Sequence, residues 1–92
     1  MNTKAKGSNR ELKSMRLLEA AGYSVTKSGA SLGLWDLVAV SPTDLILVQV
    51  KSNRQPPPAE REQLQDFRCP SNCRKLIHVW KDYARQPLVK EL

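Results

Sequence analysis

With 92 residues, 40% of them hydrophobic, the chain has material for one domain with a modest core and too little for two. Lysine and arginine number 15 against 9 aspartate and glutamate residues, which gives a formal net charge of +6. This excess attracts polyanions, so nucleic acid is the leading partner, although a generic basic surface would carry the same charge.

The N-terminal part is predicted to hold a flexible basic arm over residues 1–7, followed by a helix over residues 9–21. The arm is polar and basic, as expected of a segment that contacts phosphates. Ser8 and Glu11 have the spacing of a capping box, which needs no catalytic role for the glutamate. Gly22 stands where a helix usually stops.

The middle of the chain predicts three strands. Residues 23–27 alternate and are rich in β-formers, and residues 28–33 form a loop of small residues. Residues 35–40 and 45–51 follow as two strand-like runs, with turn formers at every position of Ser41–Asp44 between them, so they predict a hairpin. The second run is apolar at consecutive positions, which suits a central strand covered on both faces.

The last third predicts a helix and two more strands. A proline-rich loop over residues 53–58 cannot continue a sheet, and a helix follows over residues 58–68. Residues 76–80 predict a further strand and residues 88–89 a short edge strand. The fold class is therefore α/β with the order α-β-β-β-α-β, in a single domain over residues 8–92.

Polar side chains interrupt the two strands of the hairpin. Gln49 and Lys51 share one face of their strand because side chains alternate, and each costs desolvation unless a partner meets it. Asp36 stands in the preceding strand, where an apolar residue would cost less free energy of desolvation. The hairpin brings Asp36 close to Gln49 and Lys51. A carboxylate, an amide oxygen and an ammonium at one end of a sheet suit Mg²⁺ or Mn²⁺ and phosphodiester chemistry.

At these residues the sequence resembles the PD-(D/E)XK nuclease superfamily, in particular its small members, which include archaeal Holliday junction resolvases and VRR-NUC domains. The resemblance covers nearly the whole chain and implies a restriction-endonuclease-like core with a mixed central sheet. Its segments are Glu11, Gly22–Val25, Ser31, Trp35–Ala39, Val48–Ser52, Glu62–Leu64 and Phe67.

The resemblance also implies roles for the site residues. Asp36 would be the principal metal ligand, and the side chain of Gln49 and the carbonyl of Val50 would complete the metal site. Lys51 would orient or activate the attacking water, and Glu11 would bind a metal directly or through water. The departure from the family pattern is Gln49, where an acid is usual; its neutral amide still ligates through oxygen but should weaken metal affinity.

Contacts to DNA are expected outside this set. By the resemblance, Ser31 would contact the scissile phosphate. Trp80 and Tyr83 have alternative interpretations, as base-stacking side chains, as a dimer contact or as packing residues. The candidates for phosphate contacts are basic residues near the N-terminus and after the central strand, namely Lys4, Lys6, Arg10, Lys13, Arg16 and Arg54.

Composition also bears on other partners and on the compartment. Cys69, Cys73 and His78 are too few soft ligands for a zinc site, so the cysteines are expected to be free. The longest apolar run, Leu45–Val48, is too short to cross a membrane. A cytoplasmic protein without a small-molecule cofactor is therefore expected, and so small a core favours a homodimer.

The leading hypothesis is a metal-dependent DNA endonuclease with Holliday-junction-resolvase-like structure selectivity. Because Gln49 removes a charge, one alternative is a nuclease-fold module that binds DNA with weak or no catalysis. Another is a nuclease subunit that cuts only together with a separate recognition protein.

Overall fold

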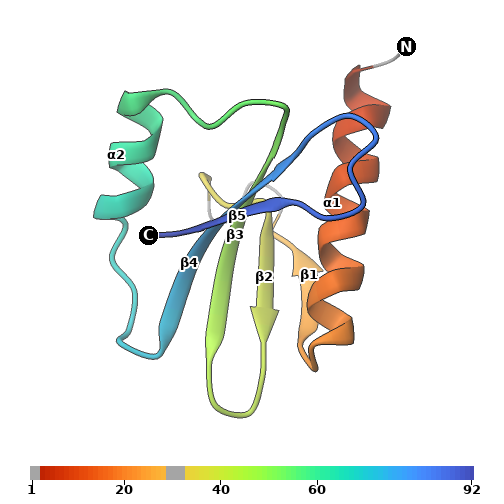
Figure 1. Cartoon of the computed structure of the whole chain (residues 1–92). Helices are drawn as coiled ribbons and strands as arrows, with labels where there is room; N and C mark the ends of the chain where they lie inside the picture. The colour runs from red at the N-terminus through yellow and green to blue at the C-terminus, as the bar shows by residue number, and fades with distance from the viewer. Residues whose placement is uncertain (1–2, 29–32) are drawn as a thin grey trace.

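The computed structural model describes residues 3–28 and 33–92, and for residues 3–8 it describes the backbone alone. A five-stranded mixed sheet lies between two helices (Figure 1). The elements in chain order are α1 (Thr3–Ala20), β1 (Ser24–Lys27), β2 (Leu37–Val40), β3 (Leu45–Ser52), α2 (Pro58–Asp66), β4 (Cys73–Trp80) and β5 (Leu88–Glu91). The predicted α/β order is confirmed, including the short edge strand.

The sheet has the strand order β1-β2-β3-β4-β5. β1, β2 and β3 form an antiparallel meander, β4 lies parallel to β3, and β5 is antiparallel to β4. A parallel neighbour requires a crossover, and α2 supplies it. The carboxyl ends of β3 and β4 therefore lie at the same end of the sheet, which is also where β2 begins.

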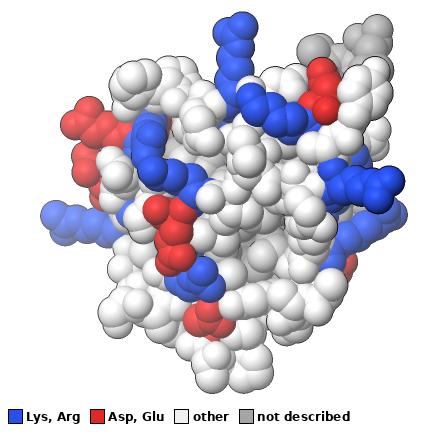
Figure 2. Space-filling view, viewed as in Figure 1, with Lys and Arg blue, Asp and Glu red and all other residues white. Residues whose placement is uncertain are grey.

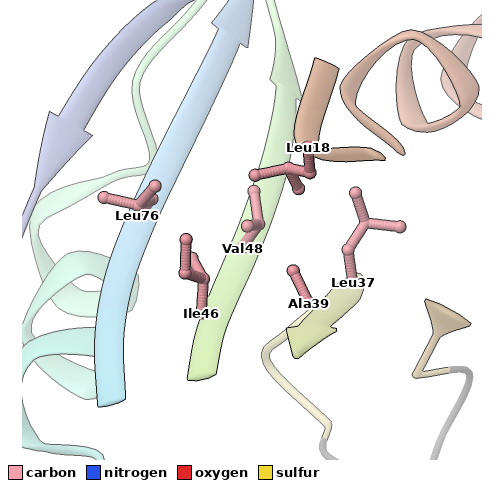
Figure 3. Close-up of a cluster of buried hydrophobic side chains, with 6 residues drawn as sticks. All are labelled: Leu18, Leu37, Ala39, Ile46, Val48 and Leu76. Atoms are coloured by element: carbon pink, nitrogen blue, oxygen red, sulfur yellow. The ribbon is translucent and has the colours of Figure 1, made fainter. Parts of the chain in front are cut away.

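Each helix covers one face of the sheet, and each face has its own core. On the α1 face, Leu18 packs against a cluster of buried residues from β2, β3 and β4 (Figure 3). On the α2 face, Leu64 packs with Trp35, Leu47 and Ile77. β3 contributes alternate residues to both clusters, so the consecutive apolar positions of this strand are explained by its central place.

The first helix is longer than the sequence predicts. It begins at Thr3 rather than at residue 9, so residues 3–7 of the expected basic arm are helical. Lysine and alanine there are good helix formers, and their propensity outweighs the capping signal by which the helix is expected to begin after Ser8. Ser8 consequently lies inside the helix, and Glu11 lies in its middle rather than in a capping box. The predicted end of the helix is confirmed. The Gly22 N–H donates to the Glu19 carbonyl, and the Tyr23 N–H donates to the Leu18 carbonyl. Gly22 adopts a φ of 99°, as is common for a glycine that ends a helix.

A buried polar network fastens α1 to β4. The Trp80 Nε1–H donates to Ser14 Oγ at 2.8 Å, and Ser14 Oγ lies 2.9 Å from His78 Nδ1. All three residues are buried, and burial lowers the pKa of His78 to about 4, so the imidazole is neutral at neutral pH. His78 and Trp80 are therefore structural residues that hold the helix carrying Glu11 at a fixed place on the sheet.

Figure 2 shows lysine and arginine side chains spread around the edge of the viewed face, with acidic side chains among them. Within the described part of the chain, no helix is long and apolar enough to cross a membrane.

Candidate active site

Asp36 lies directly before β2 and is tied to the end of β3. The register pairs Leu37 with Val48, and the Asp36 N–H donates to the Val48 carbonyl at 2.9 Å, which extends the ladder by one residue. The Val50 N–H then donates to Asp36 Oδ2 at 2.7 Å. Because one carboxylate oxygen is fixed by the backbone of β3, the second, Oδ1, is the candidate metal ligand.

Gln49 and Lys51 project on the α2 face of β3, as the alternation of strand side chains predicts. Val50 packs on the opposite face against the α1 core. Gln49 is 5% exposed, whereas the side chain of Lys51 retains 32% of its exposure. The predicted convergence of the carboxylate, the amide and the ammonium at one end of the sheet is thus what the structure shows.

The amide of Gln49 has a fixed orientation. Its Nε2 donates to Glu60 Oε1 at 2.6 Å and to the Leu34 carbonyl at 3.3 Å. A flipped amide would turn Oε1 toward two acceptors, which is repulsive, so the assignment follows from the network. In this orientation Gln49 Oε1 is buried and has no hydrogen-bond partner among the residues that the structure describes. A buried carbonyl oxygen without a partner costs free energy, and a cation would satisfy it.

Glu60 belongs to this cluster and is missed by the sequence analysis. It stands in the first turn of α2, and Oε1 lies 3.0 Å from Lys51 Nζ as well as accepting from Gln49. In the sequence Glu60 is an acid two residues after Pro58, and an acid in the first turn of a helix is equally well explained by its favourable interaction with the helix dipole. The crossover between β3 and β4 carries the start of α2 back over the end of β3, and only the three-dimensional structure reveals this.

Glu11 approaches the site from α1. Its side chain is 27% exposed, and Oε1 lies 3.8 Å from Lys27 Nζ of β1. The pKa of Glu11 is raised, first by burial and then by repulsion from Asp36, while Lys27 opposes the rise. The repulsion indicates that the two carboxylates are close enough to interact, as two ligands or outer-shell groups of one cation would be.

The charges of the cluster act on Asp36. Burial raises its pKa, the Val50 hydrogen bond and Lys51 lower it, and Glu60 raises it. The charged form of Asp36 is therefore disfavoured by its surroundings, and a bound cation would favour it. A half-buried carboxylate with a raised pKa is common at functional sites.

The donor set suits a divalent cation that takes few protein ligands. Among the residues described, no three acidic, histidine or cysteine side chains lie together as a metal site by themselves. Mg²⁺, however, prefers oxygen ligands, retains several waters and often takes one or two carboxylates. Asp36 and the unpartnered Gln49 Oε1 fit this requirement, with Glu11 and Glu60 nearby.

The residues predicted to contact phosphates differ in their exposure to solvent. Lys13, Arg16 and Arg54 are exposed. Arg10 is not available, which corrects the prediction: it is 6% exposed, and its Nη2 lies 2.6 Å from Asp82 Oδ1. Three other predicted DNA contacts lie outside the described residues, namely Ser31 and the side chains of Lys4 and Lys6.

The remaining candidates take no part in the cluster. Cys69 and Cys73 are free, as expected, and burial together with Cys69 raises the pKa of Cys73 to about 11. Such a thiol is a poor nucleophile and a poor metal ligand at neutral pH.

The comparison with solved structures supports the fold. The chain is similar to Hjc, a Holliday junction resolvase from the archaeal hyperthermophile Archaeoglobus fulgidus, with a TM-score of 0.68 and 21% sequence identity. The match covers 95% of this chain and 71% of the resolvase chain. No family model and no curated protein sequence matches the chain. The mixed sheet with flanking helices is thus a resolvase fold, in agreement with the predicted fold class.

Proposed function

We propose that the chain is a metal-dependent DNA endonuclease that hydrolyses phosphodiester bonds and selects branched DNA such as four-way junctions. The observation that carries the proposal is the buried Gln49 Oε1, which has no hydrogen-bond partner among the described residues. It belongs to a cluster in which Glu60 contacts both Gln49 and Lys51, and in which Lys51 and Glu60 both act on the pKa of Asp36. The likeness to a Holliday junction resolvase supports the substrate class, and the net charge of +6 suits DNA.

Each residue has a distinct role in this proposal. Asp36 and Gln49 Oε1 would hold Mg²⁺ or Mn²⁺, with the Val50 carbonyl and Glu11 as further ligands or outer-shell groups. The metal would supply Lewis-acid polarisation of a phosphodiester oxygen. Lys51 offsets phosphate charge and orients the attacking water. When a DNA phosphate binds, the Lys51 ammonium leaves Glu60 and pairs with the phosphate. A homodimer would supply two such sites for paired nicks.

Glu60 supplies the acidic charge that Gln49 lacks. The family pattern implied by the sequence has an acid at position 49, and here a carboxylate oxygen lies 2.6 Å from the Gln49 amide nitrogen. The negative charge of the site is therefore retained but enters from α2 rather than from β3. This arrangement argues for an active enzyme rather than for a nuclease-fold module that has lost catalysis.

A second candidate, a DNA-binding module without catalysis, is favoured by the neutral Gln49 itself. The variant Gln49→Glu separates the two. If the native protein is active, the added charge lowers the Mg²⁺ concentration for half-maximal cleavage about tenfold, equivalent to about 1.4 kcal/mol of metal binding. Metal titrations of cleavage measure this shift.

The matched control is Gln63→Glu, which adds the same charge at an exposed position of α2. It should leave the metal requirement unchanged. The proposal would be contradicted if the native protein cut none of the substrates while the Gln49→Glu variant did. That result would identify a DNA-binding module that has lost catalysis. Activity that appears only in a mixture with another protein would identify a partner-dependent subunit.

A further inference from the structure

A hollow lies between α1 and the loop that joins β4 to β5, apart from the candidate active site. Its volume is about 430 Å³, and its lining residues are Lys13, Arg16, Leu17, Trp80, Ala84 and Arg85. In Figure 1 this loop, in blue, passes over α1. The active-site side chains of β3 lie on the α2 face of the sheet, whereas Trp80 lies on the α1 face beside Ser14.

The walls of the hollow are held in place by specific contacts. The ion pair between Arg10 and Asp82, at 2.6 Å, ties the loop to α1. The Asp82 N–H also donates to Asn53 Oδ1 at 2.9 Å, which ties the loop to the segment after β3. Trp80 is 2% exposed and anchored by Ser14. The hollow is consequently a preformed feature of the fold.

The lining combines positive charge with apolar surface. Lys13, Arg16 and Arg85 are cations, and no carboxylate is among the lining residues. Leu17 and Ala84, which are partly exposed, supply the apolar surface, and the buried Trp80 lies beneath them, with Lys13 Nζ 5.5 Å from the centre of its ring. Cations alone would suit any anion, whereas a ligand that meets both parts carries an anionic group and a weakly polar group, as a nucleotide does.

Tyr83, which precedes Ala84 in the loop, adds an aromatic face. Its side chain is fully exposed, and its φ is 64°, a left-handed conformation that is costly for a bulky residue. Because the ring is fully exposed, it takes no part in the packing of the described residues. A fully exposed aromatic ring next to a basic hollow is what stacking on a nucleobase requires.

We infer that this hollow, together with Tyr83, binds one unstacked nucleotide of the DNA. The phosphate meets Arg16, Arg85 and Lys13, and the base meets the apolar lining and the tyrosine ring. The site lies at the same end of the sheet as the active site, because Trp80 pairs in register with Ser52, the residue after Lys51. The inference rests on the proposed function for its ligand and explains how a small domain prefers branched DNA, in which nucleotides leave the stack more easily than in a duplex.

The test measures DNA binding in chelator, so that no cleavage occurs. The probes are a fluorescent duplex with one unpaired nucleotide and the same duplex fully paired, read by anisotropy over a salt series. The double variant Arg16→Gln/Arg85→Gln should weaken binding about tenfold and reduce the slope of log affinity against log salt by about two. The control Arg68→Gln/Lys90→Gln removes the same charge at exposed positions outside the hollow and should weaken binding less than about threefold.

Two uncharged changes test the base contact. Ala84→Trp fills the hollow, and Tyr83→Ala removes a ring that makes no packing contribution, so the second variant folds even if the first does not. Each should reduce the preference for the unpaired nucleotide at least about fivefold. An unchanged preference in Tyr83→Ala, or equal effects of the two double variants, would overturn the inference. Since these assays contain no metal, their results do not depend on whether the native protein cuts DNA.

Discussion

Replacing Asp36 with asparagine should reduce Mg²⁺-dependent DNA cleavage at least about 1,000-fold, which corresponds to about 4 kcal/mol of transition-state stabilisation. Asparagine has the shape of aspartate and keeps an oxygen that can accept the Val50 N–H, now found on Asp36 Oδ2 at 2.7 Å. The substitution therefore removes the charge of the principal metal ligand with little disturbance of the strand end. Initial cleavage rates at saturating metal measure the effect.

Fold and DNA affinity provide the controls for Asp36→Asn. Burial raises the pKa of Asp36, so its charged form is disfavoured by the fold, and loss of the charge should leave the metal-free protein at least as stable. Binding to DNA in chelator should stay within about threefold, because phosphate contacts by the basic side chains are unaffected. Unaltered cleavage in the variant would refute the assignment of Asp36.

Glu60→Gln should reduce cleavage about 100-fold and raise the metal concentration that cleavage requires. Glu60 is an acid near Asp36, and Oε1 lies between the amide of Gln49 and the ammonium of Lys51, at 2.6 and 3.0 Å. Its loss takes a negative charge from the site that holds the metal, at a cost of about 3 kcal/mol in the transition state. Metal titrations of cleavage rate measure both effects.

An exchange of the two residues gives the sharper form of this test. In the double variant Gln49→Glu/Glu60→Gln the acid returns to β3 and the amide moves to α2, so the total charge of the site is that of the native protein. Cleavage should recover to within about fivefold of the native rate. Glu62→Gln, at an exposed position two residues along α2, is the matched control and should have little effect. Equal behaviour of Glu60→Gln and Glu62→Gln would show that Glu60 has no part in the site.

The sequence predicts the centre of the site because that centre depends on local rules. Strand alternation places Gln49 and Lys51 on one face, and a short hairpin turn brings the start of β2 beside the end of β3. Both features can be read from the chain without knowledge of its tertiary packing. The consecutive apolar positions of Leu45–Val48 likewise predict a central strand.

The features that the sequence did not predict depend on contacts between distant segments. Glu60 reaches the site through the crossover path of α2, and Arg10 is removed from the surface by Asp82, 72 residues away. The hollow at Trp80 also needs α1 and the loop between β4 and β5 to come together. The early start of α1 has a different cause, since helix propensity over residues 3–7 prevailed over the capping signal at Ser8.

The most direct test of a metal-dependent, structure-selective nuclease is cleavage of four labelled DNA substrates by the native protein: linear duplex, single strand, flap and four-way junction. Each is incubated with Mg²⁺ or Mn²⁺ and, in parallel, with chelator. Cutting that requires the metal and is fastest on the four-way junction is the predicted result. Tight binding to all four substrates without cutting of any in either metal would contradict the account.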